Sequence, residues 1–239
     1  MGIDVWVRKN VPEMESFVQD ATPAVVEIAT SQAVVMAETE APLNHPATPD
    51  NDVLTLDWAA LQTRVAQCDL CELHKTRTQT VFGTGSHHAD WLIIGEAPDV
   101  PEDSQGEAFV GAGGQLLNAM LRALDLKRED VYITNSLKCC SQNRAITESE
   151  VRCCSSYLQR QIQLLQPKII LILGSTAAQH VLQTNTTLGR LRGRVHHFDY
   201  SPVPVIVSYH PAYLLSSPLE KRNSWEDLLF AKSMLVSGD

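Results

Sequence analysis

WLIIGEAPDV, residues 91–100, is the stretch from which the architecture of this chain can be worked out. Trp91 to Ile94 is a short, continuous apolar run that stops at Gly95, a pattern typical of a buried central strand ending in a tight loop. In open α/β sheets, ligand-binding and catalytic groups lie just beyond the carboxyl ends of the strands. Glu96 therefore falls where such a sheet presents a functional side chain, although a single acidic loop residue is equally compatible with no chemistry.

Further apolar runs flank this stretch and alternate with helical patterns. Runs at 131–134, 168–173 and 203–207 predict three more strands. Helical apolar spacing begins at Trp58, where Asp57 is the expected N-cap, and recurs at 116–126, 148–165, 177–182 and 223–234. Strands that alternate with helices predict a three-layer α/β/α sandwich around a central four-stranded parallel sheet, with right-handed crossovers.

Charge is distributed unevenly along the 239 residues, which carry a formal net charge of −9. No Lys or Arg occurs from Asn10 to Thr63, and the nine acidic residues there account for the whole of that charge. This segment is also rich in proline and lacks sustained apolar periodicity. We therefore predict a short amphipathic peptide at 1–12, an acidic disordered linker at 13–57 and one folded domain at 58–239.

The six cysteines suggest a metal or redox site. No apolar run approaches the roughly 18 residues of a membrane span, and the N-terminus lacks a signal-peptide layout, so we expect a cytoplasmic protein with no membrane partner. In that reducing compartment, cysteines indicate metal binding or redox chemistry before disulfides. A four-cysteine site for zinc or an iron–sulfur cluster is one interpretation, and small buried residues are the other. The thiols are Cys68 and Cys71 in a C-x-x-C pair, then Cys139-Cys140 and Cys153-Cys154.

Polar residues follow three of the predicted strands. Glu96, Asn135 and His210 bring an acid, an amide and an imidazole to one edge of the sheet. Each alone is better explained as structural, but together they predict a binding pocket. Phe109 is a large apolar residue in the polar, glycine-rich segment 103–114, where it is either an anchor or a stacking surface.

Six motifs of this chain occur together in one known family. They are CDLCELHKTRTQTVFGTG (68–85), GEAP with ED (95–98 and 102–103), FVGAGGQLL (109–117), YITNSLKC (132–139), LRG (191–193) and YHPAYLL (209–215). In these motifs the chain resembles the family 4 uracil-DNA glycosylases, which carry a four-cysteine iron–sulfur cluster. The resemblance covers about residues 58–236.

The resemblance implies hydrolysis of the N-glycosidic bond of deoxyuridine in single- or double-stranded DNA, as in base excision repair, with the nucleotide flipped out of the stack. His210 would stabilise the departing uracil, and Glu96 would position or polarise the attacking water. Phe109 would stack on the base and Asn135 would hydrogen-bond its edge. Ala97 and Pro98 complete the implied substrate-binding set.

Cluster and DNA contacts are also implied by the resemblance. Arginines would hold phosphates, and a leucine would fill the vacated stack. The implied DNA contacts are Arg190, Arg192, Arg194 and Leu214, with Leu215 as the alternative wedge. The implied ligands of a [4Fe–4S] cluster, a structural clip near the DNA-binding face, are Cys68, Cys71, Cys139 and Cys154.

The chain departs from the family pattern at three places. Asp99 stands where the family has glycine, which predicts weak uracil excision that improves in Asp99→Gly, because a carboxylate repels a uracil anion. Cys140-Ser141-Gln142 replaces an arginine and two prolines, and Ser216 replaces an arginine, so a weaker grip on DNA is expected. The alternative interpretation is a weakly active or non-catalytic, glycosylase-like binding module in a larger DNA-processing complex.

The first twelve residues, MGIDVWVRKNVP, have their own resemblance. They are similar to the N-terminal peptide of the psi subunit of the bacterial DNA polymerase III clamp loader. Ile3, Trp6 and Arg8 would bind that partner, since an exposed aromatic residue beside an arginine is a typical hot spot. The linker would then tether the domain to the replication machinery. In the alternative interpretation, the chain is a psi-like subunit of the clamp loader.

Overall fold

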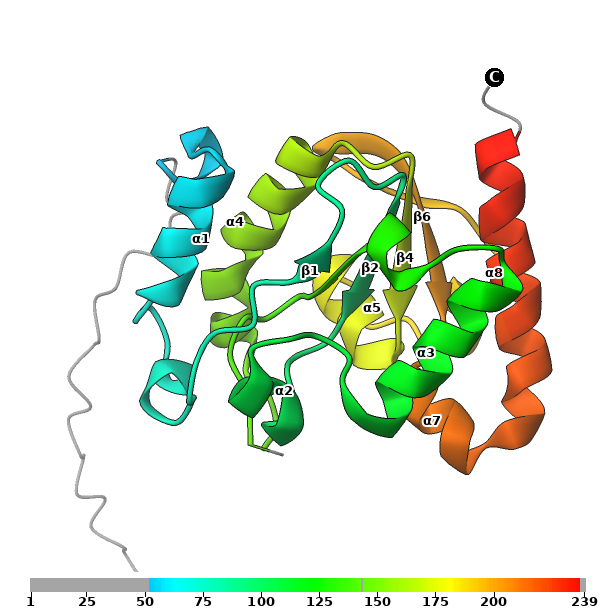
Figure 1. Ribbon diagram of the computed structural model, residues 1–239, viewed down its shortest axis with the longest axis horizontal. Coiled ribbons are helices and arrows are strands. Elements are labelled where there is room, and N and C mark those ends of the chain that lie inside the picture. The colour runs from blue at the N-terminus through cyan, green and yellow to red at the C-terminus, as the bar shows by residue number, and fades with distance from the viewer. Residues whose placement is uncertain (1–51, 143, 237–239) are drawn as a thin grey trace, which may run out of the picture. The chain divides into compact units, whose positions relative to one another are not determined.

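A computed structural model describes residues 52–142 and 144–236 (Figure 1). The predicted partner-binding residues Ile3, Trp6 and Arg8, and the linker up to residue 51, lie outside the described residues. The described part contains one six-stranded sheet with strand order β1-β3-β2-β4-β6-β5. Its strands are β1 (Thr84–Gly85), β2 (Trp91–Gly95), β3 (Tyr132–Asn135), β4 (Ile169–Leu173), β5 (His196–Phe198) and β6 (Ser201–Ser208).

The four inner strands are the ones that the sequence predicts. β3, β2, β4 and β6 pair in parallel, whereas β1 and β5 add antiparallel edges that the apolar pattern does not predict. β2 and β4 are buried along their whole length, which explains why both appear as continuous apolar runs. A central four-stranded parallel sheet is thus confirmed within a wider, mixed sheet.

Helices cover both faces of the sheet and form the two outer layers (Figure 1). Trp91 and Ile93 point to the face covered by α3 and α8, while Leu92 and Ile94 point to the face covered by α4 and α5. The helices are α1 (Trp58–Ala66), α2 (Val100–Gln105), α3 (Gly111–Ala123), α4 (Glu148–Leu165), α5 (Ser175–Val181), α6 (Leu188–Leu191), α7 (Pro211–Ser216) and α8 (Lys221–Val236). Short 3-10 turns are η1 (Val53–Thr55), η2 (Glu72–Lys75), η3 (Arg128–Asp130) and η4 (Pro218–Glu220).

Segment 103–114 is more helical than its polar, glycine-rich composition predicts. Asp99 caps α2 through its side chain, and Gly106 ends α2 in the left-handed conformation with φ 73°. α3 then begins at Gly111, ahead of the apolar pattern that starts at residue 116. Between the two helices, Phe109 adopts φ 56°, a conformation that a non-glycine residue adopts only when its surroundings hold it there.

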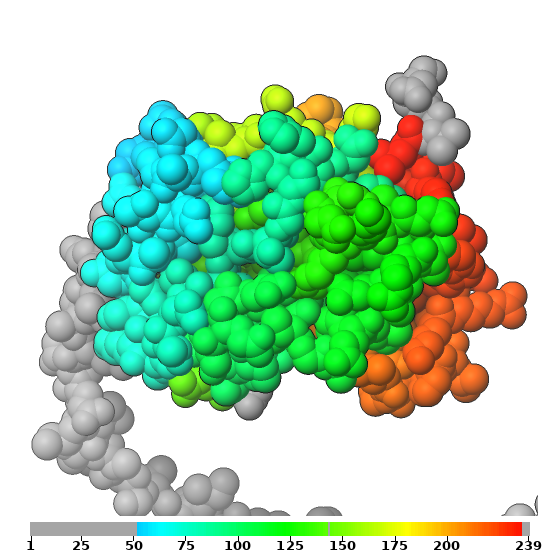
Figure 2. Space-filling view, in the orientation of Figure 1, coloured from blue at the N-terminus to red at the C-terminus, as the bar shows by residue number. Residues whose placement is uncertain are grey.

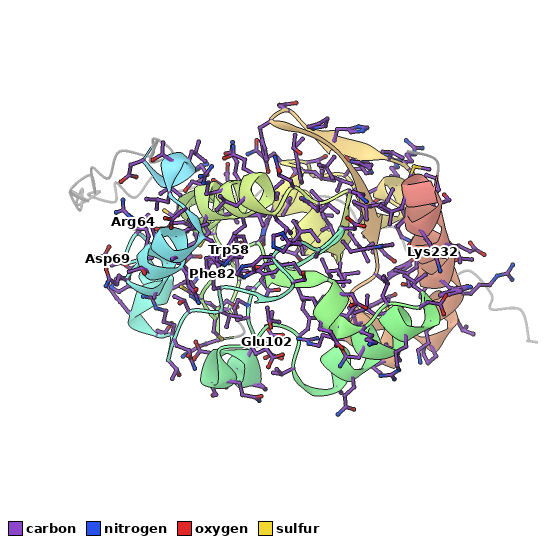
Figure 3. All side chains as sticks on the ribbon, turned by 45° about the horizontal axis from the view of Figure 1, so that its top comes forward. Trp58, Arg64, Asp69, Phe82, Glu102 and Lys232 are labelled. Atoms are coloured by element: carbon purple, nitrogen blue, oxygen red, sulfur yellow. The ribbon has the colours of Figure 1, made fainter. Side chains whose placement is uncertain are left out.

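A third, smaller core lies beside the sheet and contains the cysteine region. Val53, Leu61 and Phe82 are buried there together with Cys139 and Cys154. Trp58 packs against this core, and its ring centroid lies 5.5 Å from that of Phe82 (Figure 3). Val53 is fully buried, so the folded part includes residues of the segment predicted as linker.

The helices of the described residues were compared with what a membrane span requires. Not one of them combines the length and the apolar character that crossing a bilayer requires.

Candidate active site

The carboxyl ends of β2 and β3 bring predicted site residues into contact. Gly95 and Asn135 are paired in register at the ends of these two strands. A Cβ atom on Gly95 would clash with Asn135 Oδ1 and would lie 2.8 Å from Phe109 Cε2. Position 95 therefore requires glycine, because any side chain would push the amide and the aromatic ring apart.

Phe109 and His210 face each other across this site. Their rings are stacked, with centroids 5.3 Å apart and an interplanar angle of 29°. Phe109 is 4% exposed, and it reaches the site from the loop between α2 and α3. His210 comes from the end of β6, where it directly precedes α7. An aromatic ring, an amide and an imidazole thus gather at one edge of the sheet.

The local structure around His210 fixes its protonation. His210 Nδ1 accepts a hydrogen bond of 3.2 Å from the backbone N–H of Ala212, so a neutral ring carries its proton on Nε2. Burial lowers the pKa of His210 below its ordinary value, and the charge of Asp99 opposes that shift. The imidazole is therefore a neutral hydrogen-bond donor near neutral pH.

Glu102 is a buried carboxylate that sequence reasoning noted only as part of an acidic pair. It is 7% exposed and lies on the inner side of α2 (Figure 3). Its Oε1 accepts from the backbone N–H of Phe109 at 2.7 Å, and its Oε2 accepts from Asn135 Nδ2 at 3.1 Å. Burial, followed by the charge of Asp99, raises the pKa of Glu102 to about 7. One side chain therefore holds two predicted substrate-binding residues.

The loop after β2 holds the backbone of Glu96 in place. Its carbonyl oxygen accepts from Ser136 Oγ at 2.6 Å and from the backbone N–H of Leu137 at 3.0 Å. The Glu96 side chain is half-buried, as is Ala97, whereas Pro98 is buried. Glu96 lies close enough to His180 of α5 for its charge to raise the pKa of that imidazole, although burial, the larger effect, lowers it.

The cysteine region is the second predicted site. All six cysteines are free thiols. Cys139 and Cys154 are buried in the small core, and Cys68 and Cys71 pack against it. The thiols of this core are therefore the four that were predicted as ligands. Of the remaining two, Cys140 has the carboxylates of the α2 region as its charged neighbours, and Cys153 Sγ donates to the carbonyl oxygen of Leu70 at 3.4 Å.

Electrostatic coupling also relates these four thiols. Burial raises the pKa of Cys154 far above its ordinary value, and negative charge on Cys139, Cys71 and Cys68 raises it further. Burial likewise raises the pKa of Cys71 to about 11, with added contributions from Cys139, from the neighbouring Cys153 and from Cys68. Arg77 Nη1 donates to Cys139 Sγ at 3.1 Å, a contact that favours a thiolate.

The donor set is chemically suited to a thiolate-bound cluster, since four thiols from three chain segments share one core. No group of three His, Cys, Asp or Glu side chains between Asp52 and Val236, residue 143 aside, is already arranged to hold a metal ion. The thiols would have to turn toward a common centre on binding.

Comparison with known proteins identifies the family. The model of the uracil DNA glycosylase superfamily matches residues 82–230. The chain belongs to this superfamily, in its type-4 family. It is 44% identical over 161 residues to a type-4 uracil-DNA glycosylase of Archaeoglobus fulgidus, which covers 64% of this chain and 81% of that protein.

Two further type-4 uracil-DNA glycosylases show similar likeness. The protein of Sulfurisphaera tokodaii is 35% identical over 185 residues, or 74% of this chain and 84% of its own length. The protein of Pyrobaculum aerophilum is 37% identical over 180 residues, or 72% of this chain and 92% of its own length. The predicted family and fold are therefore confirmed.

Two of the side chains that the family resemblance implies as DNA contacts are held inside the protein. Arg192 donates to Asp227 at 2.6 Å and to the carbonyl oxygen of Asn223 at 2.6 Å, and its guanidinium lies over the ring of Tyr209. A side chain held in this way serves packing and is unavailable to a phosphate. Leu214 is 1% exposed and cannot act as a wedge from its buried position.

Other side chains in the same regions remain available for DNA. Arg190 and Arg194 are exposed on either side of Arg192. Tyr213 and Leu215 of α7 are 48% and 45% exposed. α7 packs against the start of α3, where Ala212 lies next to Gly113, and the two segments lie side by side in Figure 2. Of the two leucines that the resemblance implies as a wedge, Leu215 is the exposed one.

Asp99 has a structural role at the position where the type-4 pattern has glycine. It is exposed, and its Oδ1 accepts from the backbone N–H of Glu102 at 2.9 Å as the N-cap of α2. This cap helps to place Glu102, although the Asp99 charge still acts on both Glu102 and His210. Asp99 thus has two effects: its charge is predicted to weaken base binding, and its cap contributes about 1 kcal/mol to stability.

Proposed function

We propose that this chain hydrolyses the N-glycosidic bond of deoxyuridine in DNA. The observation that carries the proposal is the contact set at the sheet edge, where Phe109 and Asn135 lie against Gly95 and His210 stacks on Phe109. A glycosylase acts on a base extruded from the stack, so it needs a stacking surface, an edge-reading group and a donor for the leaving base. These three residues supply one function each.

Base recognition belongs to Phe109 and Asn135. The phenyl ring supplies a flat apolar face, and its loop is held by Glu102 and by the close approach of Gly114. The Asn135 amide can donate one N–H to uracil O4 and accept from N3–H, while its other N–H stays on Glu102.

His210 stabilises the leaving group. Cleavage leaves negative charge on uracil, and a fixed donor aimed at that charge lowers the barrier. The Ala212 N–H on Nδ1 keeps the His210 proton on Nε2, the atom left free for the base. Because burial lowers the pKa of His210, the ring acts as a neutral donor and transfers no proton.

Glu96 is placed to orient the attacking water. Its backbone is held by Ser136 and Leu137 at the end of β2, next to the glycine that borders the base site. A half-buried carboxylate there can accept a hydrogen bond from the attacking water and stabilise the positive charge that develops on the sugar.

Cys68, Cys71, Cys139 and Cys154 would hold a [4Fe–4S] cluster. When bound, the cluster would act as a structural cross-link and take no part in bond cleavage. The four thiols would join the C-x-x-C loop, the chain after β3 and helix α4. Since Cys139 lies four residues beyond Asn135, the cross-link would stabilise the chain that leaves the base site.

DNA would be held on the rim of the site by Arg190 and Arg194, with Leu215 as the wedge. The three side chains are exposed, and no ion pair is formed by either arginine among the described residues. Phosphate contacts from two arginines are few, so binding should be weak and should depend only shallowly on salt.

The test compares three oligonucleotides that differ only at one central base, which is uracil, cytosine or thymine. Excess protein should release base from the uracil strand alone. His210→Ala should slow release by roughly 10²-fold, in the range of losing one donor to a developing oxyanion, with DNA affinity unchanged. Equal release from His210→Ala and wild type would contradict the proposed role of the imidazole.

A further inference from the structure

Glu102 touches both sides of the base site, yet it has no role in the chemistry described above. Its carboxylate lies between a backbone N–H from the Phe109 loop and the Asn135 amide at the end of β3. It is 7% exposed, so solvent does not compete for these bonds. Burying a carboxylate costs free energy, which its two hydrogen bonds offset in part.

The polarity of this chain of hydrogen bonds is fixed from one end. The backbone N–H of Phe109 can only donate, so Glu102 Oε1 must accept from it at 2.7 Å. The second oxygen of an ionised carboxylate is also an acceptor, which requires the NH2 side of Asn135 to face it, at 3.1 Å. Asn135 Oδ1 then faces the other way, toward Gly95 and the base site.

This orientation distinguishes two bases of almost identical shape. Uracil presents an acceptor at O4 and a donor at N3–H, whereas cytosine presents a donor at its amino group and an acceptor at N3. An amide whose oxygen faces N3 matches uracil, and the reversed amide would match cytosine. An unrestrained asparagine can turn to suit either base.

We propose that Glu102 is the positioning residue that sets the choice of uracil over cytosine, because it holds the Asn135 amide in one orientation. This inference rests on the proposed function of the site. Glu102 itself does not contact the base, and it acts only through Asn135.

Replacing one oxygen of Glu102 reverses the hydrogen-bond chain. In Glu102→Gln, the side-chain oxygen must still accept from Phe109 N–H, so the NH2 group turns toward Asn135. Asn135 must then offer its oxygen to the glutamine and its NH2 group to the base. Shape and volume barely change, whereas the donor and acceptor pattern toward the base is inverted.

The experiment measures binding of free uracil and free cytosine by NMR titration, which needs no turnover, together with single-turnover release of uracil from DNA. Wild type should prefer uracil. Glu102→Gln should lose that preference or invert it, and its uracil release should fall by roughly 10²-fold or more, because a buried site that hydrogen-bonds one pattern rejects the other. Glu107→Gln is the matched control, because Glu107 is an exposed acid just after α2 and pairs with Arg128.

The outcomes are separable. A folded Glu102→Gln protein that keeps the wild-type preference for uracil overturns the inference, whether or not uracil is released from DNA. A wild-type protein that prefers free uracil yet releases none from DNA contradicts the proposed function, and a lost or inverted preference in Glu102→Gln would then still support the inference. If Glu102→Gln fails to fold, Glu102→Ala decides, because it should weaken the preference without inverting it.

A measurement on the wild-type protein gives an independent answer. The side-chain NH2 signals of Asn135, identified by their loss in Asn135→Ala, should show slow rotation and slow hydrogen exchange, because one N–H is bonded to Glu102. Fast rotation and fast exchange of that NH2 group would overturn the inference even if every variant unfolded.

Discussion

The ring of Phe109 stacks on the imidazole of His210, although the two residues are 101 positions apart in the chain. The contact joins the loop between α2 and α3 to the segment that begins α7. In the proposed reaction the flipped base would stack on this same aromatic ring, which is already oriented before the substrate arrives.

Phe109→Ala should weaken binding of uracil-containing DNA more than it slows the chemical step, because stacking acts on the bound base before cleavage. We expect a loss of about 10-fold in affinity, within the roughly 1–3 kcal/mol typical of one stacked base. Binding of the same strand with thymine in place of uracil should not change. An equal loss for both strands would show that Phe109 serves only the fold.

Asp99 combines a favourable cap with an unfavourable charge, and two substitutions separate these effects. Asp99→Asn keeps a side-chain oxygen for the N–H of Glu102 and removes the charge, so it should release uracil faster than wild type at unchanged stability. Asp99→Gly should also be faster but should lose a few tenths of a kcal/mol of unfolding free energy. Rates are compared under single-turnover conditions, and a wild-type rate equal to both would show that the charge is harmless.

The pH dependence should follow Glu102, whose pKa burial and the Asp99 charge raise to about 7. Only the ionised carboxylate accepts from both Phe109 and Asn135, so uracil release should rise as the pH passes through about 7. The inflection should vanish in Glu102→Gln. His210 contributes separately at lower pH, because its pKa lies below its ordinary value.

Stability should change with pH in the opposite direction. The folded protein retains the Glu102 proton between the ordinary pKa of 4.5 and about 7, while the unfolded chain has lost it. The contribution of Glu102 to the free energy of unfolding therefore falls as the pH rises through this window. Urea unfolding of wild type and Glu102→Gln at several pH values checks the sign.

The proposed cluster ligands are tested by a matched pair of neighbouring cysteines. Protein purified without oxygen should be brown and contain about four iron atoms per chain. Cys154→Ser should lose the iron and destabilise the domain, whereas Cys153→Ser should keep it, because only Cys154 lies in the small core with the other thiols. Iron loss in Cys153→Ser with retention in Cys154→Ser would reverse the assignment, and zinc in place of iron would refute the cluster.

The clamp-loader hypothesis concerns the first twelve residues and is tested separately. Affinity for the purified clamp-loader collar should fall at least about 10-fold in a protein lacking residues 1–12 and in Trp6→Ala, since a single aromatic anchor commonly dominates a short peptide interface. Arg222→Ala in the folded domain is the control. Equal affinity for all the proteins would eliminate the tether.

The central strands were predictable because burial on both faces leaves a direct mark on the sequence. Trp91 to Ile94 are all buried, so the run is apolar without interruption. The strand-end rule then placed Asn135 and His210 correctly. β1 and β5 were not predicted, because strands of two and three residues at a sheet edge leave no such pattern.

Residues whose role depends on distant partners could not be assigned from local patterns. Glu102 acts through contacts 7 and 33 positions away, and nothing in the pair Glu102-Asp103 distinguishes it from a solvated acid. Arg192 was expected on DNA, yet its partner Asp227 is 35 positions away. Lys138 is similar, since its ammonium is fully buried and donates to Thr134, Asn135 and Gln161.

Catalysis itself is tested by single-turnover release of uracil by the wild-type protein, from a single-stranded oligonucleotide with one central uracil, at a pH about one unit above the Glu102 pKa and at low salt. Free uracil should appear, and an abasic strand cleavable by alkali should remain. Asn135→Ala should strongly reduce both, because it removes the group that reads the edge of the base. Binding of the strand without any release of uracil would contradict the proposed reaction, and would leave a glycosylase-like binding module as the function of this chain.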